Sequence, residues 1–152
     1  MSDAQLFDDS LPIALLRARD AVTALFRDHV GAAGLTMQQW RVIRALAGGI
    51  ALDTTTLANR CVILAPSLTR IIRHLGDRGL VEQVPSRDRR QRVLKLTPRG
   101  EALFTEIWQI SQKKYAAIED AFGRDELRQL VVSLNHLRTC LETDHKAGED
   151  AA

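Results

Sequence analysis

The stretch that decides the fold runs from residue 65 to residue 100 and reads APSLTRIIRHLGDRGLVEQVPSRDRRQRVLKLTPRG. Its pattern predicts an amphipathic helix, a strand, a tip rich in arginine, a second strand and the start of another helix. The stretch holds nine Lys and Arg residues against three acidic residues, a net charge of +6, whereas the rest of the chain sums to −4. A local excess of positive charge on a nearly neutral chain indicates a polyanionic partner at one surface.

Length and composition limit the classes of protein to which this chain can belong. The chain has 152 residues, enough for one domain with a real core, and 45% of them are hydrophobic. No apolar run approaches the roughly 20 residues of a membrane span. The first residues are acidic and lack the basic and apolar segments of a signal peptide. We therefore expect a soluble cytoplasmic protein with no membrane partner.

Outside the hairpin, helix signals dominate the chain. Residues 80–84 and 92–96 are predicted strands, and 145–152 are expected to fray. Glycines are expected to end several of the helices, Gly31 and Gly34 the first of them. The predicted helices are 11–30, 36–47, 54–61, 65–78, 98–122 and a last one that begins near residue 125.

Three short helices followed by a hairpin predict a winged helix-turn-helix, in a chain that is mainly α with a small two- or three-stranded β wing. The last helix carries large aliphatic residues at 127, 130, 131, 134, 137 and 141, more than one neighbour in a small protein needs. We expect one protomer over 1–152, with a DNA-binding lobe at 35–97 and dimerisation helices at 10–34 and 98–145. The alternative is a helical cap within a monomer.

No enzyme site is predicted. The chain shows no Ser/His/Asp, Cys/His or paired-carboxylate arrangement with a supporting context. The histidines have no metal-ligand spacing and are expected at the surface or in caps, and the cysteines are expected to be buried small hydrophobes. We therefore expect no metal and no cofactor. The residues concerned are His29, His74, His136, His145, Cys61 and Cys140.

A family resemblance rests on the wing. Asp88-Arg89-Arg90, followed by LTPRG at 96–100, resembles the D-x-R-x5-L-T-x-x-G signature of the MarR family of transcription regulators. The resemblance extends over essentially the whole chain and includes Leu57-Ala58, Leu68-Thr69-Arg70, Leu75 and Arg78-Gly79-Leu80-Val81. It implies a homodimer that binds a pseudo-palindromic double-stranded DNA operator, most often as a repressor.

The helix at 65–78 is the expected recognition helix. Its first turns should face base edges in the major groove. Arg70 or Arg73 could contact guanine O6 and N7 in bidentate fashion, worth about 1–3 kcal/mol of discrimination; a phosphate contact is the alternative. Leu68, Ile71, Ile72 and Leu75 are expected to supply the inward face, although Ile71 and Ile72 cannot both point straight in. The polar residues placed to contact DNA are Ser67, Thr69, Arg70 and Arg73.

The wing tip carries Arg87, Arg89, Arg90 and Arg92. An arginine in a narrow minor groove gains from its enhanced negative potential without reading a detailed base code. We predict that Arg89 enters the groove and that Arg87 and Arg90 contact phosphates. The resemblance implies that Asp88 pairs with a wing arginine and so stabilises the wing; Arg90 belongs to the signature, but the sequence leaves the partner open.

The turn before the recognition helix departs from the common pattern, in which glycine is followed two residues later by a serine or threonine cap. Val62 and Leu64 occupy these places, so the helix start is expected to be uncapped or shifted by about one residue. SLPIALLRARDAV, LTMQQWRVIRAL and CVILAPSLTRI are similar to the branch that represses homoprotocatechuate catabolism genes. That resemblance implies an aromatic acid effector such as 4-hydroxyphenylacetate.

Effectors in this family commonly bind where the dimer helices meet the DNA-binding lobe. A carboxylate needs a guanidinium, and an aromatic ring needs apolar or indole walls. The alternative for each candidate is a core position or an ordinary surface ion pair. A DNA-binding protein without an effector and a protein-interaction module that uses the wing also remain open. The candidate effector-binding residues are Arg17, Arg19, Trp40, Arg41, Arg44 and Trp108.

Overall fold

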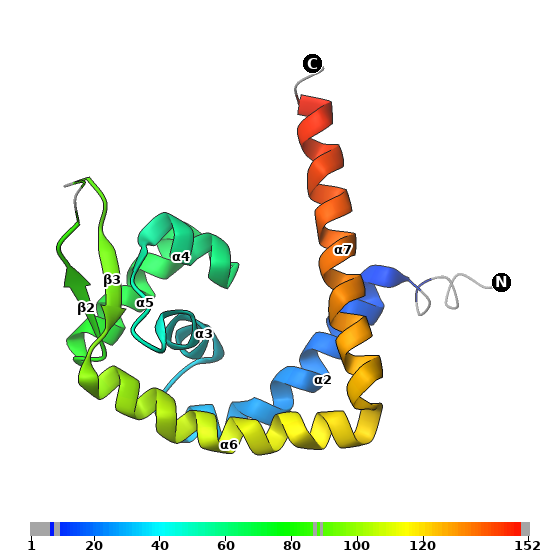
Figure 1. Cartoon of the computed structure of the whole chain (residues 1–152), viewed down its shortest axis with the longest axis horizontal. Helices are drawn as coiled ribbons and strands as arrows, with labels where there is room; N and C mark the ends of the chain where they lie inside the picture. Colours follow the sequence, from blue (N-terminus) through cyan, green and yellow to red (C-terminus); the bar gives the residue numbers. More distant parts are fainter. Residues whose placement is uncertain (1–6, 8–9, 87, 89, 150–152) are drawn as a thin grey trace. The chain divides into compact units, whose positions relative to one another are not determined.

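The computed structural model describes residues 7, 10–86, 88 and 90–149, with side chains up to residue 142. The chain divides into two compact units, residues 1–111 and 112–152. Figure 1 shows the elements in chain order: α2 (Leu11–Ala32), α3 (Met37–Leu46), β1 (Leu52–Asp53), α4 (Thr54–Cys61), α5 (Ala65–Asp77), β2 (Val81–Val84), β3 (Val93–Leu96), α6 (Pro98–Phe122) and α7 (Arg124–Glu149).

The structure confirms a mainly helical fold with a small sheet. Its strand order is β1-β3-β2, and both pairs of strands are antiparallel. The two-residue strand β1 has no alternating pattern of its own and exists only by pairing Leu52 with Leu94 of β3. Two predicted boundaries are wrong: Gly31 lies inside α2, and α7 continues to Glu149, past the point where fraying was expected.

Side-chain caps set the starts of two helices in the first unit. Thr36 and Gln39 form a reciprocal capping box at α3, in which each side chain accepts a bond from the other's backbone N–H. Asp53 caps α4 by accepting bonds from the Thr56 hydroxyl and N–H, and these bonds lower the pKa of its carboxyl. Ser10, at the N-cap position of α2, makes no side-chain cap bond.

The hydrophobic core is formed by α3, α4, α5 and the sheet, and it includes Val30 of α2 and Ile107 of α6. Trp40, Ile43 and Leu46 of α3 are at most 2% exposed and belong to the same buried cluster as residues of α5 and the sheet. Ile71 and Ile72 are both buried, as expected for the inward face of α5. The reason is that α5 contacts α3, α4 and β2 together, so that a broad arc of its surface is covered.

A buried polar contact joins α2 to α6. His29 Nε2 and Ser111 Oγ are hydrogen-bonded at 2.9 Å, and Ser111 is fully buried. The His29 ring also packs against Phe26 at a tilted angle, with centroids 5.9 Å apart. The expectation of a surface or capping role for His29 is therefore wrong, since this ring fixes two helices at their crossing.

The two cysteines differ. Cys61 is buried as expected, and burial raises the pKa of its thiol while the nearby Arg41 charge acts in the opposite direction. Cys140 is exposed in the single chain, and one protomer does not test the burial expected for it in a dimerisation helix. Its burial would need a second molecule on α7.

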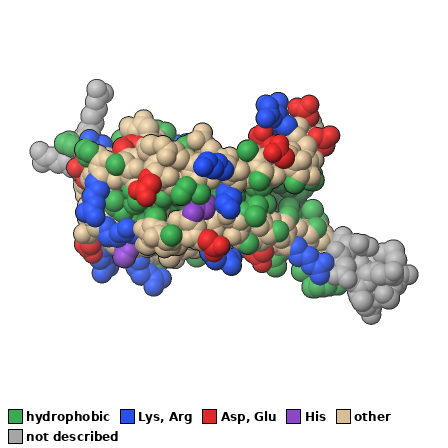
Figure 2. Space-filling model, turned by 90° about the horizontal axis from the view of Figure 1, so that it is seen from below, with side chains coloured by type: hydrophobic (Ala, Val, Ile, Leu, Met, Phe, Trp, Pro, Cys, Tyr) green, Lys and Arg blue, Asp and Glu red, His purple; other side chains and the backbone are tan. Residues whose placement is uncertain are grey.

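Apolar side chains remain exposed along two helices of the single chain. On α7 the leucines at 130, 134 and 141 share one stripe, and on α2 the exposed stripe includes Leu11, Leu15, Val22 and Leu25. Figure 2 shows hydrophobic side chains reaching the surface between charged ones on the face that includes α6. None of the described helices is long and apolar enough to cross a membrane.

Candidate DNA-binding surface

The helix-turn-helix consists of α4, a three-residue turn and α5. Val62 adopts the left-handed conformation (φ 52°) that glycine usually supplies, and the Ile63 N–H donates to the Ala58 carbonyl at 3.0 Å. No side chain caps α5 at Leu64, as expected from its sequence. The helix nevertheless begins at Ala65, because the Leu68 N–H donates to the Leu64 carbonyl at 2.9 Å and Pro66 presets the first turn.

The structure brings the predicted recognition residues to the uncovered side of α5. Thr69, Arg70 and Arg73 are exposed, and Ser67 is half-buried. The Thr69 hydroxyl donates to the Ala65 carbonyl at 3.0 Å. This bond uses the hydroxyl proton, so toward a ligand Thr69 offers its oxygen as an acceptor together with its methyl group.

A shallow groove of about 430 Å³ runs between α5 and the start of α3. Ser67, Arg70 and His74 line it from α5, and Gln38 and Gln39 line it from α3. His74 and the two glutamines were not predicted to line this surface. The spacing of His74, four residues after Arg70, could have placed both on one helix face, whereas the approach of α3 is a tertiary feature.

A second groove, of about 440 Å³, lies on the other flank of α5. Leu64 and Thr69 line it together with Thr55 and Asn59 of α4. Arg92, which directly precedes β3, also lines this groove. The start of the wing's second strand is therefore beside the recognition helix.

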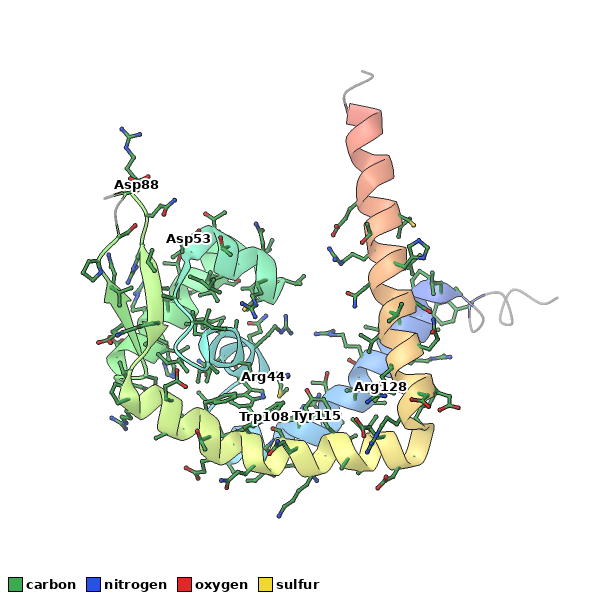
Figure 3. The ribbon with its side chains drawn as sticks, viewed as in Figure 1. Arg44, Asp53, Asp88, Trp108, Tyr115 and Arg128 are labelled. Atoms are coloured by element: carbon green, nitrogen blue, oxygen red, sulfur yellow. The ribbon has the colours of Figure 1, made fainter. Side chains whose placement is uncertain are left out.

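The wing is a two-stranded ribbon whose tip is shaped by Asp88. Strands β2 and β3 pair from Val81 with Leu96 to Val84 with Val93. Asp88 lies at the tip (Figure 3), where its Oδ1 accepts the backbone N–H of Arg90 at 2.9 Å. Asp88 thus holds a local turn through a main-chain bond to the residue that the family signature names, and Arg90 is exposed. Arg87 and Arg89 lie outside the described residues.

The L-T-x-x-G part of the signature joins the wing to α6. The Thr97 hydroxyl donates to the Gly79 carbonyl at 2.6 Å, and its oxygen accepts the Gly100 N–H at 3.1 Å. The Thr97 N–H donates to the Leu80 carbonyl at 3.0 Å. Gly100 is buried so closely against the strand that a Cβ there would overlap the Leu80 carbonyl oxygen. Threonine caps the helix, and glycine permits its approach to the strand.

Arg78, at the end of the recognition helix, has an internal role. Its guanidinium donates to the Gly34 carbonyl at 2.7 Å and to the Ala33 carbonyl at 3.1 Å. These bonds connect the C-terminus of α5 to the loop between α2 and α3. This link orients α5.

Two of the candidate effector-binding residues are brought together. The Arg44 guanidinium lies 5.1 Å from the centroid of the Trp108 ring (Figure 3). Trp108 stacks on Phe104, which stacks in turn on Trp40. Phe104 was missed because its position between the two tryptophans depends on the packing of α6 against α3. Trp40, only 2% exposed, is chiefly a core residue.

The other candidates lie on α3 and α2. Arg41 donates to the Cys61 carbonyl at 2.8 Å and thereby joins α3 to the end of α4. Arg17 and Arg19 are exposed on α2. Among the described residues, no three His, Cys, Asp or Glu side chains are grouped to hold a metal ion.

The chain is similar in sequence to known DNA-binding regulators. The sequence model of the MarR family matches residues 33–92. The chain is 41% identical to the HTH-type transcriptional regulator FarR of Neisseria gonorrhoeae, over 88% of this chain and 94% of that protein. It is also 41% identical to the homoprotocatechuate degradative operon repressor of Escherichia coli, over 80% of this chain and 83% of that one.

Solved structures extend the likeness. The crystal structure of NadR in complex with 4-hydroxyphenylacetate superposes with a TM-score of 0.77 at 43% identity, covering 84% of this chain and 92% of that one. The repressor CouR bound to a 23-mer DNA duplex superposes with a TM-score of 0.79 at 26% identity, covering 91% and 99%. With its winged helix-turn-helix, its wing signature and relatives at 41% identity along most of their length, the chain belongs to the MarR family of transcription regulators.

Proposed function

We propose that this protein is a homodimeric transcriptional repressor that binds a pseudo-palindromic operator and is released from it by a small aromatic acid. The observation that carries DNA binding is the recognition helix, which leaves Thr69, Arg70 and Arg73 exposed in a stretch with a net charge of +6. CouR, whose fold superposes on this chain, was solved on duplex DNA. Binding, rather than catalysis, is the proposed role, in the cytoplasm where the chromosome lies.

The proposed dimer uses helices from both ends of the chain, 10–34 and 98–145. The leucine stripes of α2 and α7 are exposed in one protomer, and apolar stripes at three- and four-residue spacing suit helix packing between subunits. Residues 35–97 then form the DNA-binding lobe. Two-fold symmetry would present two recognition helices about one helical turn of DNA apart, which matches a pseudo-palindrome.

The proposed effector is an aromatic carboxylic acid. Arg44 and Trp108 supply a cation beside an indole, the two groups that such a ligand needs, and Phe104 extends the aromatic wall. NadR, 43% identical, was crystallised with 4-hydroxyphenylacetate, and the E. coli relative is the homoprotocatechuate degradative operon repressor. The effector would act by stabilising a conformation with lower affinity for the operator.

The direct test is a fluorescence-anisotropy titration of the full-length protein on DNA from the region upstream of its own gene. A scrambled duplex serves as the control, and 4-hydroxyphenylacetate and 3,4-dihydroxyphenylacetate are added separately. Selective binding that either acid releases is the expected result. Selective binding that neither acid affects would favour a winged-helix DNA-binding protein without this effector, and binding without selectivity would contradict the proposal.

Substitutions on the recognition helix and the wing should separate base reading from phosphate attraction. Arg70→Ala or Arg73→Ala is expected to relax sequence preference by about 1–3 kcal/mol for each base pair that the arginine reads. Arg89→Ala, at the proposed minor-groove position, is expected to lower affinity on all sequences. Binding to operator and scrambled DNA is measured over a salt series. Parent-like operator binding by all three variants would contradict this docking.

Substitution of Arg44 should separate effector response from DNA binding. Arg44→Ala removes the proposed partner of the effector carboxylate, so we expect operator affinity to stay near that of the parent while release by 4-hydroxyphenylacetate needs at least tenfold more acid, as the removal of a charge-assisted bond of about 1.5–3 kcal/mol implies. Arg27→Ala, an exposed arginine on α2, is the matched control. An unchanged response in Arg44→Ala would exclude this arginine.

A further inference from the structure

Two large apolar side chains stand exposed at the turn of the helix-turn-helix. Val62 is 83% exposed and Leu64 is 80% exposed, more than any other large hydrophobic residue whose side chain the structure describes. Ile63 between them is 8% exposed and belongs to the core cluster. The turn is therefore anchored by one residue, and its two neighbours are directed outward.

Val62 and Leu64 both occupy positions where another residue type would make the turn more stable. A β-branched residue at φ 52° is strained where glycine would not be, and a leucine at the N-cap provides no acceptor for the first N–H groups of α5. Local departures of this kind are expected at functional positions, where another requirement selects the residue. The departures expose an apolar group at the start of the recognition helix.

The surroundings of Leu64 indicate what it contacts. It lines the groove beside Thr69, together with the polar Thr55 and Asn59, the cationic Arg92 and the apolar Ala58, Ile63, Leu68 and Ile72. Ile63, Leu68 and Ile72 are buried in the core, so Leu64 is the exposed large apolar side chain of this groove. An exposed apolar side chain beside polar and cationic ones suits the major groove, where polar base edges and phosphates surround a single apolar group. That group is the C5-methyl of thymine.

On these grounds we propose that Leu64 contacts a thymine methyl group and so makes the protein prefer a T·A pair at one position of each operator half-site. The inference rests on the proposed DNA-binding function. The first residues of a recognition helix are those that contact base edges, and Leu64 directly precedes α5. Val62 supplies the backbone conformation of the turn that presents Leu64.

Deoxyuridine in place of thymine tests this contact, because it removes only the methyl group. Each thymine of the operator is replaced symmetrically in both half-sites, and the affinity of the full-length protein is measured by anisotropy. We expect one pair of positions at which the affinity of the parent falls about fourfold per methyl, the factor that burial of one methyl-sized group implies. In Leu64→Ala the effect at that position should disappear.

Two further variants control for folding. Leu64→Ser introduces a side-chain cap and should raise the thermal unfolding temperature while it abolishes the methyl dependence, so that a weaker fold cannot explain the result. Val62→Gly relieves the strained φ and should retain the methyl dependence. Opposite changes in stability and base preference distinguish a DNA contact from a structural role.

The possible outcomes distinguish failure of the Leu64–thymine contact from failure of the proposed operator binding. Selective operator binding with no methyl-dependent position, or a methyl dependence that persists in Leu64→Ala, would overturn the contact and leave the regulator intact. A changed oligomeric state of Leu64→Ser with unchanged methyl dependence would assign the patch to a protein contact instead. Absence of selective binding by the parent protein would overturn both proposals.

Discussion

Replacing Gly100 by alanine is expected to destabilise the fold by about 3 kcal/mol, the upper part of the range for overpacking in a close-packed interior. The added Cβ would overlap the Leu80 carbonyl oxygen and lie 3.2 Å from Leu96 Cβ. The carbonyl oxygen belongs to the backbone and accepts the Thr97 N–H, so it cannot move aside without breaking that bond. The gain in helix propensity, about 1 kcal/mol, offsets only part of this cost.

Gly31 offers the matched control. It also lies in a helix, α2, but a Cβ there would meet nothing within 4 Å. Gly31→Ala should therefore leave stability unchanged or raise it by up to about 1 kcal/mol. Urea unfolding, followed by circular dichroism at one fixed protein concentration, measures both variants. Equal stability of Gly100→Ala and the parent would show that α6 can shift away from the strand, and would refute this account of the signature glycine.

Leu134→Glu is expected to convert the protein to a monomer at micromolar concentration and to lower operator affinity at least a hundredfold. Leu134 lies at the centre of the exposed α7 stripe, between Leu130 and Leu141. An unpaired carboxylate in an apolar interface costs several kcal/mol for each copy, and two-fold symmetry places two copies there. Operator affinity falls because two linked lobes bind two half-sites far more tightly than separate ones do.

His136→Glu is the control for that change. It adds a carboxylate two residues away, about 200° around the helix, on the face opposite the stripe. Its dimerisation and operator binding should match those of the parent. Sedimentation equilibrium gives the oligomeric state, and circular dichroism checks that α7 is still helical. A dimeric Leu134→Glu protein would refute the assignment of this stripe to the interface.

The local elements followed from the sequence because their signals are local. The capping box of Thr36 and Gln39 and the cap Asp53 lie within three residues of the groups that they bind. The exposed recognition residues were predicted because polar and apolar side chains alternate with helical period along α5. The wing signature could be recognised because its interactions are also local: Asp88 binds the backbone of a residue two positions later.

The features that the sequence did not predict concern surfaces created by neighbouring elements. The period of α5 placed Ile71 and Ile72 on its inward side without showing how completely each is buried, because that depends on three elements packing around the helix at once. His29 was expected at the surface, and its partner Ser111 lies 82 residues away. A contact between residues so far apart in the chain cannot be predicted from local periodicity.

By itself, then, the sequence determined the helices, the hairpin, the position of the cationic surface and the family, because propensity, capping and spacing act over a few residues. Only the tertiary structure decided the position of Arg92 beside the recognition helix, the bonds of Arg78 to the loop before α3, and the placement of Arg44 over Trp108. Each of these joins residues that are far apart in the chain. Their contact depends on how the core packs the elements, and the free energy of that packing is shared among many side chains rather than carried by one motif.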